Sequence, residues 1–386
     1  MQMAEKGILS LDDPISKYIP EFTNKNQDTV RIWHLMCHSG GFFPLPRIVV
    51  EDVAKSLNLN KEIDGDLAYN DKLVAERLDS QTMENGLIGH AGEYLSYCND
   101  GFGLLSDIIR RYGKEASYAD YLNEHILKPL GMDRSGCDFV KPAKDENAAI
   151  LYKKENGVKV SHRNYHDNAF VLNGGGAMKS TLADLKKYLA MYLNEGTALD
   201  GTHILDEYGI HEMCKPRQIY RPQSYYGYGL SIEHLDDLTV IEHGGALPGV
   251  SSNISWSYDA DAAVIVLCNT SGVPVSLIAD ALMRVYNGKS PIVTRDKYQE
   301  VSWDEKTIGE AVGMYVSGEG TEVELYQKED GTVGMRTDGK EQNLIPVNPR
   351  MAIIRGKMTD GNITLYWRNG KIFAIRYGGR MIPKSK

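Results

Sequence analysis

The sequence predicts an α+β fold in which helices flank an antiparallel sheet, followed by a small C-terminal all-β module. Three observations lead to this prediction. Before residue 226 apolar residues recur mostly with helical spacing, between 226 and 268 they form strand-length runs, and after 300 short alternating runs are separated by Asp-Gly and Asn-Gly pairs. Helices on either side of late antiparallel strands are typical of a layered α+β domain.

Helical spacing defines the elements before and after the sheet. Helices are expected over residues 30–37, 102–112, 117–127, 181–193 and 274–286. Residues 1–7 read as the last turns of an amphipathic helix with Gly7 at its C-cap, and Ser180 or Thr181 is expected to cap the fourth of the helices above. Residues 44–90 are expected to form short surface helices and loops.

The strands of the main sheet are expected over residues 226–233, 238–242, 252–256 and 262–268. The last of these is apolar on both faces, which favours a central, covered strand. Four hairpin signals follow, at Asp330-Gly331, Asp338-Gly339, Asp360-Gly361 and Asn369-Gly370. We therefore expect a first domain over residues 1–288, a linker over 289–302, and a small β-meander or barrel-like domain over 303–386.

Composition excludes several classes of function. The 43 Lys and Arg residues against 52 Asp and Glu residues give a net charge of −9, without a basic block, so a nucleic-acid partner is not expected. No apolar run approaches the roughly 20 residues of a membrane span. The five scattered cysteines do not indicate a disulfide framework. The pattern His34-x-x-Cys37-His38 supplies only one turn of ligands, so neither a metal nor another cofactor is expected.

Tyr97-Cys98-Asn99 is the first candidate for catalytic chemistry. The Tyr-x-Asn spacing recurs at Tyr121 and Tyr192, but those two lie inside predicted helices. Tyr97 instead lies where a loop enters a long helix, a position that puts polar side chains beside a helix N-terminus at the edge of a cleft. The alternative is an ordinary half-buried tyrosine.

His243-Gly244-Gly245 is the second candidate, with similar triplets at His38 and His90. Only His243 ends a predicted strand and precedes a turn. Glycines at a strand edge let a substrate approach closely and leave N–H groups free to bind an oxyanion. The alternative is a hairpin turn with an exposed histidine.

Taken in order, seven blocks resemble the serine β-lactamase and penicillin-binding-protein superfamily, in its class C β-lactamase, family VIII esterase and D-aminopeptidase branch. The blocks are Ala4-Glu-Lys-Gly-Ile-Leu-Ser-Leu-Asp-Asp-Pro14, His34-Leu-Met-Cys-His-Ser-Gly-Gly41, Gly92-Glu-Tyr-Leu-Ser-Tyr-Cys-Asn99, Lys128-Pro-Leu-Gly-Met132, Gly174-Gly-Gly-Ala-Met-Lys-Ser-Thr-Leu-Ala-Asp184, Tyr226-Gly-Tyr-Gly229 and His243-Gly-Gly-Ala-Leu-Pro-Gly249. They span residues 1 to about 285. The resemblance implies a transpeptidase-like fold, and implies that the C-terminal module caps the cleft or mediates assembly.

The resemblance also implies roles for individual residues. A serine of a Ser-x-x-Lys element attacks a carbonyl to form an acyl-enzyme. Tyr97 would carry the proton, Asn99 would hydrogen-bond the substrate and His243 would be the strand-side partner. Gly244, Gly245 and Ala246 would bind substrate, with the Ala246 N–H offered to the oxyanion. Because a free tyrosine has a pKa near 10, Tyr97 would need positive charge nearby to act as a base.

The sequence departs from this family in two ways. It contains no Ser-x-x-Lys, and the resemblance places that serine roughly three helical turns before Met1. We therefore expect the native N-terminus to be missing and this chain to be inactive by itself; the alternative is a pseudoenzyme or non-catalytic binding protein with a cleft for a peptidoglycan-like ligand. In addition, His243-Gly244 replaces Lys-Thr, which disfavours substrates with a carboxylate and favours other esters or amides.

The expected partner is a small-molecule or peptide substrate. The residues leave the oligomeric state open. They also leave the location open, between bacterial cytoplasm and cell envelope.

Overall fold

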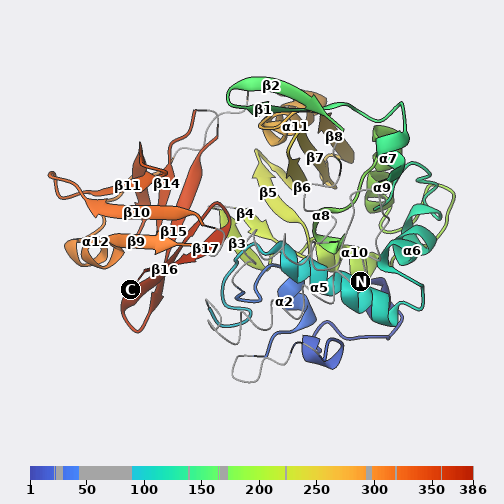
Figure 1. Ribbon diagram of the computed structural model, residues 1–386, viewed down its shortest axis with the longest axis horizontal. Helices are drawn as coiled ribbons and strands as arrows, with labels where there is room; N and C mark the ends of the chain where they lie inside the picture. The colour runs from blue at the N-terminus through green and yellow to red at the C-terminus, as the bar shows by residue number, and fades with distance from the viewer. Residues whose placement is uncertain are drawn as a thin grey trace.

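The computed structural model describes residues 1–20, 22, 29–42, 89–137, 140–163, 165, 173–221, 224–292, 298–317, 320–357 and 359–385. The helices and loops expected over residues 44–90 fall, except for the last two residues, outside the described part. Within the described part, no helix is both long and apolar enough to cross a membrane. Figure 1 shows a six-stranded sheet surrounded by helices on one side of the molecule and two smaller sheets on the other.

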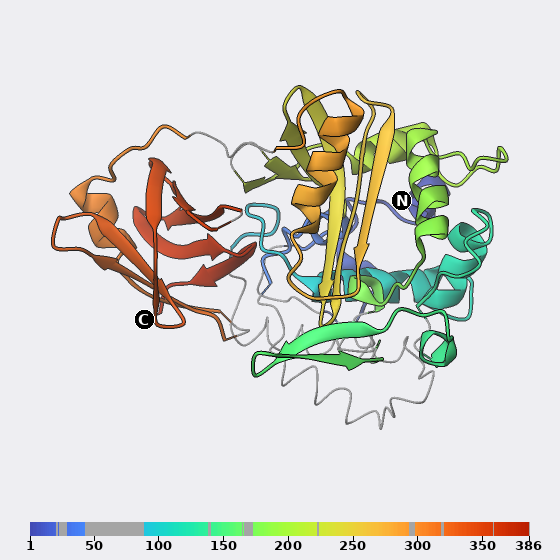
Figure 2. The same cartoon turned by 90° about the horizontal axis from the view of Figure 1, so that it is seen from above.

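The main sheet is antiparallel throughout and runs in the order β3-β4-β5-β6-β7-β8. Its strands are β3 (Gln218–Arg221), β4 (Ser224–Tyr226), β5 (Ser231–Leu235), β6 (Leu238–Leu247), β7 (Val250–Ser257) and β8 (Ala262–Cys268). Neighbouring residues of β6 face opposite sides, as expected for a strand. Val240 packs with Met283 of α11 (Val275–Tyr286), whereas Ile241 lies in one core with Trp256 and Tyr192 of α9 (Leu182–Leu193). The sheet therefore separates two helical layers, with α11 against one face in Figure 2.

The antiparallel sheet and its flanking helices confirm the predicted fold class, with three corrections. The run expected over 226–233 is broken between β4 and β5, where Gly229 takes a φ of +73°. Strand β6 continues five residues beyond the expected end at Glu242. Strand β8 has the expected bounds but lies at the edge of the sheet, so the prediction of a central strand was wrong. Its apolar side chains are explained by helices packed over it, because α9 and α11 both contact β8.

The helices before the sheet follow the expected order. They are α1 (Gln2–Glu5), the 3₁₀ turn η1 (Ile15–Lys17), α2 (Ile32–Met36), α5 (Asn99–Tyr112), α6 (Tyr118–Leu122), the π-helical turn η2 (Asn123–Leu127), α7 (Val140–Lys144), α8 (Asn173–Gly176), α9 and α10 (Glu207–Met213), with the hairpin β1 (Leu151–Glu155) and β2 (Val158–His162) between α7 and α8. Gly7 ends α1 at a φ of +66°, and the N–H groups of Gly7 and Ile8 close a Schellman motif. Thr181, rather than Ser180, caps α9 by accepting from the Asp184 N–H at 3.2 Å.

Beyond residue 300 the chain forms two antiparallel sheets around one apolar core. Their orders are β12-β11-β10-β9 and β13-β14-β15-β16-β17, built from β9 (Gly313–Val316), β10 (Glu322–Gln327), β11 (Val333–Thr337), β12 (Lys340–Gln342), β13 (Leu344–Asn348), β14 (Met351–Ile354), β15 (Gly361–Arg368), β16 (Lys371–Tyr377) and β17 (Arg380–Pro383). A short helix, α12 (Glu305–Ala311), precedes them, so this part is not purely β. The division into domains at residues 288 and 303 stays a prediction.

Two of the hairpin signals lie at two-residue turns with left-handed backbone. These are Asp338-Gly339, with φ of +48° and +71°, and Asn369-Gly370, with +51° and +75°. Asp330-Gly331 lies within a longer loop between β10 and β11. Asp360-Gly361 was wrongly assigned as a two-residue turn, because Gly361 is already the first residue of β15.

Candidate active site

The backbone around Tyr97 is held from two directions. On one side, the Ser96 N–H donates to the His38 carbonyl at 2.8 Å and the Cys98 N–H donates to His38 Nδ1 at 3.2 Å. On the other side, the Tyr97 N–H donates to the Gly379 carbonyl at 2.8 Å. The loop before α5 is thus placed by contacts with residues remote in sequence rather than by its own turn. The two views of Figures 1 and 2 show this loop, in cyan, between the β16–β17 hairpin and the main sheet.

The Tyr97 side chain is half-buried among aromatic rings. Its ring centre lies 3.9 Å from that of His38 and 6.3 Å from that of Tyr226. The Arg380 guanidinium lies 4.9 Å from the Tyr97 ring centre. Burial raises the pKa of Tyr97, while the charge of Arg380 acts in the opposite direction and offsets part of that rise. The phenol is therefore protonated at neutral pH in this chain.

Asn99 is the first residue of α5, which begins three residues before the expected start at 102. The early start brings glycines into the first turn, where Gly101 lies against the Leu35 side chain of α2; a Cβ at Gly101 would be 3.6 Å from Leu35 Cδ2. The Asn99 side chain is half-buried and makes no hydrogen bond to another residue in the described part of the chain. Its amide therefore retains its donors and acceptor at the helix N-terminus.

His243 lies within β6 and bonds through both ring nitrogens. Its Nε2 is 3.1 Å from the Tyr226 hydroxyl and its Nδ1 is 2.8 Å from the Gly244 carbonyl. A carbonyl only accepts, so we assign the proton to Nδ1 and infer that Nε2 accepts from Tyr226. Burial lowers the pKa of His243. The imidazole is thus neutral at pH 7 and carries one defined tautomer.

Gly244, Gly245 and Ala246 are exposed on a strand edge. Strand β5 pairs with β6 only as far as Glu242, whereas β7 pairs with β6 through Leu247. From His243 onward, β6 therefore has no strand paired on the β5 side among the residues that the structure describes. Because an antiparallel strand directs alternate N–H groups to opposite edges, some N–H groups of this segment point to the open side. An acceptor on a ligand could bind there.

Tyr226 connects the two candidate motifs. It bonds His243 and lies beside Tyr97, so these three side chains form one cluster. Tyr226 is only 1% exposed, and burial raises its pKa well above the usual value, which keeps its hydroxyl available as a donor. Asn99 and residues 244–246 are joined to this cluster through the backbone, and within the described residues no side-chain hydrogen bond other than that of His243 to the Gly244 carbonyl links them to it.

The sequence reasoning missed His38, which it treated as a repeat of the His-x-Gly pattern. His38 is 3% exposed, with a φ of +55°, and its ring lies 5.0 Å from those of Phe102 and Tyr226. Burial lowers its pKa well below the ordinary value, so it is neutral. No spacing in the sequence distinguishes it, because its role depends on receiving the Cys98 N–H from another segment.

Metal-binding geometry is found elsewhere. Among the described residues, one cluster brings three ligand atoms within 4.8 Å of one another, namely Glu195, Glu207 and His211. Both glutamates are exposed, and the cluster forms ion pairs whenever the histidine is protonated. In the His34-x-x-Cys37-His38 pattern, His34 Nδ1 instead accepts from the Arg31 N–H at 3.0 Å, a helix-capping contact.

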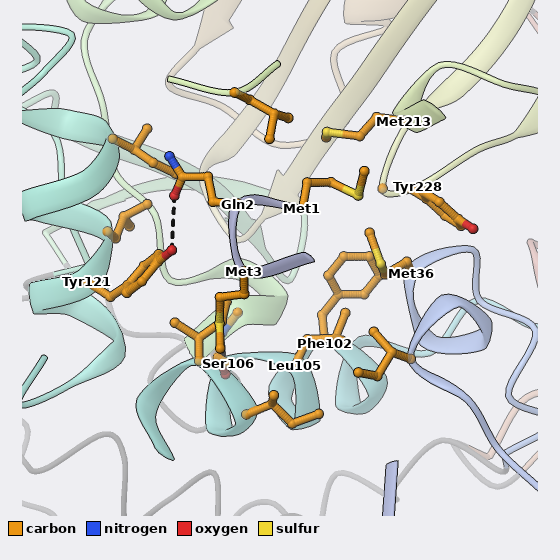
Figure 3. Close-up of a pocket in the computed structure, with 18 of the residues that line it drawn as sticks. Met1, Gln2, Met3, Met36, Phe102, Leu105, Ser106, Tyr121, Met213 and Tyr228 are labelled. Carbon is orange, nitrogen blue, oxygen red and sulfur yellow. Dashed lines mark hydrogen bonds between the residues drawn. The ribbon is translucent and has the colours of Figure 1, made fainter. Parts of the chain in front are cut away.

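A separate apolar cavity of about 340 Å³ lies beside α1, between α5, α6, α9 and α10. Figure 3 shows Met1, Met3 and Leu105 pointing into it, with Gln2 bonded to Tyr121 at its side. None of the predicted site residues lines this cavity. Phe102 lines the cavity and packs against His38, and Met36 and Tyr228, which also line it, lie in one core cluster with Tyr226 and Tyr97.

Comparisons with known proteins find relatives that match most of this chain. The putative penicillin-binding protein PbpX of Bacillus subtilis is 24% identical over 270 residues, which cover 70% of this chain and 58% of PbpX. Protein flp of Staphylococcus aureus strain MW2 is 29% identical over 308 residues, 78% of this chain and 55% of flp. The chain thus spans a little over half the length of these relatives.

Solved structures share the fold. The octameric penicillin-binding protein homologue from Pyrococcus abyssi matches over 100% of this chain and 84% of its own, with 24% identity and a TM-score of 0.63. The crystal structure of SurE matches over 100% of this chain and 84% of SurE, with 18% identity and a TM-score of 0.71. The D-amino acid amidase from Ochrobactrum anthropi SV3 matches over 70% and 73%, with 20% identity and a TM-score of 0.52.

The profile of the Beta-lactamase family matches residues 1–286, almost three quarters of the chain. The chain therefore belongs to the Beta-lactamase family, the β-lactamase-like serine hydrolases that include penicillin-binding proteins.

Proposed function

We propose that this chain forms the cleft of a β-lactamase-like serine hydrolase that cleaves an ester or amide through an acyl-enzyme. Tyr97 is the proton carrier, Asn99 binds substrate, and His243 is the partner on the strand side. The observation that carries the proposal is the Tyr97–Tyr226–His243 cluster beside the segment of β6 that has no described strand paired on its β5 side. A tyrosine, an imidazole and open backbone donors around one space are the groups that acyl transfer requires.

The proposal needs a serine nucleophile from a Ser-x-x-Lys element, which the 386 residues do not contain. By this proposal the chain of 386 residues has no turnover of its own, and the lysine of that element adds the positive charge that Tyr97 requires to act as a base.

The neutral His243 supports the class of substrate. A lysine at this position would carry a permanent charge and would bind a substrate carboxylate, whereas an imidazole with a lowered pKa offers none near pH 7. Gly244 has no hydroxyl to assist. Esters and amides without that carboxylate are therefore favoured over penicillins and cephalosporins; the amide chemistry of the structurally similar D-amino acid amidase falls in this class.

The test compares the natural gene product, including any codons before Met1, with the chain of 386 residues. The longer protein should contain Ser-x-x-Lys and hydrolyse a short-chain aryl ester much faster than a chromogenic cephalosporin. His243→Lys should raise the cephalosporin rate relative to the ester rate, and Tyr97→Phe should abolish both. A cephalosporin rate above the ester rate would overturn the substrate class; turnover by the chain of 386 residues would overturn the need for an added serine.

The second candidate is a non-catalytic protein that binds a peptidoglycan-like ligand in the same cleft. The observation in its favour is the missing Ser-x-x-Lys. It predicts that the gene encodes no such element upstream, and that a muropeptide binds saturably with loss of binding in an Asn99→Ala variant.

A further inference from the structure

The hairpin between β16 and β17 reaches from the C-terminal sheets to the Tyr97 segment. Besides the bond from the Tyr97 N–H to Gly379, the Met381 N–H donates to the Ser96 hydroxyl at 3.2 Å. Gly379 has a φ of +78°, and a Cβ there would lie 3.6 Å from the Tyr97 Cβ and 3.5 Å from the Tyr220 ring. The two backbones thus meet closely at a turn that favours glycine.

Two further contacts fix the hairpin in place. Arg376 is 2% exposed and donates to the Ile219 carbonyl of β3 and, at 3.2 Å, to the Thr364 hydroxyl of β15. Tyr94, three residues before Tyr97, stacks on Tyr366 with ring centres 4.2 Å apart. Buried charge-assisted bonds and stacked aromatic rings resist displacement. The residue that follows Gly379 therefore has a defined position at the cleft.

That residue is Arg380, which places its guanidinium over the Tyr97 ring. The other titratable groups around Tyr97 are His38, Cys98, Tyr220 and Tyr226, from the end of α2, the start of α5, β3 and β4 respectively. None of the four supplies positive charge, because a thiol and a phenol are never cationic and burial lowers the pKa of His38 so that its imidazole is neutral. His243, beyond Tyr226, is neutral for the same reason.

We propose that Arg380 is a positioning residue of the cleft, which holds the Tyr97 ring from the C-terminal sheets and supplies positive charge that favours its phenolate. The proposal rests on the role given to Tyr97 above. A phenolate at Tyr97 could accept a proton from an attacking hydroxyl and later return it to the leaving group. The guanidinium keeps its charge throughout the accessible pH range, so it acts through Tyr97 and takes no proton itself. The lowering effect of Arg380 on the Tyr97 pKa agrees with this.

The Tyr97 titration tests the proposal directly and needs no turnover. The chain is labelled with ¹³C at tyrosine Cζ, and the Tyr97 resonance is assigned by its loss in Tyr97→Phe. Arg380→Gln should raise the Tyr97 pKa, whereas Arg380→Lys, which keeps the charge, should leave it near the wild-type value. Arg336→Gln is the matched control, because Arg336 lies 4.6 Å from the Tyr326 ring in the same sheets and should not move the Tyr97 resonance.

An unchanged Tyr97 pKa in Arg380→Gln would overturn the proposal, as would equal rises in Arg380→Gln and Arg380→Lys. Thermal unfolding of all variants shows whether the hairpin remains folded, and Arg380→Lys keeps the test valid if Arg380→Gln does not fold. In the longer gene product, Arg380→Gln should move the pH profile of kcat/KM for the aryl ester to higher pH. If that product hydrolyses nothing, the proposed function fails, while the titration still decides the role of Arg380.

Discussion

Two adjacent residues of β6, Glu242 and His243, enter polar networks of opposite character on the two faces of the sheet. His243 lies on the face where the Tyr226 and Tyr97 rings gather, and burial keeps its imidazole and that of His38 neutral. Glu242 faces α11 and accepts from Asn253 Nδ2 at 2.8 Å. Its neighbours there include Glu233 of β5 and Asp280 of α11, and both pKa values are raised. On the first face the charge near Tyr97 is the Arg380 guanidinium, whereas the second face concentrates carboxyl groups.

The difference teaches that the two faces should respond to pH with opposite sign. A histidine whose pKa is lowered on folding contributes stability above its unfolded pKa near 6.5, and this contribution is lost as the pH falls. Burial raises the pKa of Glu233 and of Asp280 to about 7 each, with Glu242 adding to the rise. Their contribution is complete below the unfolded value near 4 and is lost as the pH rises to about 7.

The largest loss of stability is expected from substitutions on the face of the sheet that carries His243. His38→Ala should lower the free energy of unfolding by about 3 kcal/mol, because it removes a buried ring and leaves the Cys98 N–H without its acceptor. His243→Ala should cost less, about 1 kcal/mol, since that ring is only half-buried although its loss removes the acceptor of the Tyr226 hydroxyl. Urea unfolding at pH 7.5 measures both. Equal losses would mean that the two histidines do the same structural work.

The next effect belongs to the charged face. In the isosteric double variant Glu233→Gln, Asp280→Asn, the free energy of unfolding should rise relative to that of the wild type as the pH increases. From pH 4.5 to pH 8 this difference should grow by roughly 2 kcal/mol, since solvent around these half-buried groups moderates the effect. Urea midpoints across that range give the difference. As a control, Glu324→Gln removes a carboxylate from an exposed ion pair outside this network. A double variant whose advantage does not grow with pH would contradict the assignment of both carboxyls.

The smallest loss of stability is expected from removing the hydrogen bond between Asn253 of β7 and Glu242 of β6. Asn253→Ala should lower the free energy of unfolding by about 1 kcal/mol through loss of the donor to Glu242. Asn253→Asp should lower it further, because it sets a second carboxylate against Glu242. The same urea titrations provide the values. If Asn253→Asp is the more stable of the two, the expected repulsion between the new carboxylate at position 253 and the Glu242 side chain is contradicted.

Short sequence patterns predicted the turns, caps and strand bounds that depend on interactions between residues close in sequence. The turn at Asn369-Gly370, the cap at Gly7 and the bounds of β8 follow from backbone preference and apolar spacing, which are present in the sequence itself. The edge position of β8 was not predictable in this way, because an apolar strand covered by helices on both faces reads like a central strand.

The site was predictable only in part. Tyr97, Asn99 and His243 were selected by resemblance together with their positions beside a helix start and a strand end. Their assigned roles stay predictions. His38 and Arg380 could not be found from spacing, since each acquires its place through contacts with a segment remote in sequence. A polar residue whose role depends on a contact with a distant segment shows no regular spacing in the sequence that would identify it.

The bond between Met381 and Ser96 joins residues 285 positions apart and has a consequence for the order of events during synthesis. The segment that carries Tyr97 leaves the ribosome long before the strand that holds it in place. Domains generally fold as units from the N-terminal side as they are made. The main sheet can therefore assemble while the Tyr97 loop still lacks its partner, and the cleft reaches its final shape only once β17 has been translated and docked.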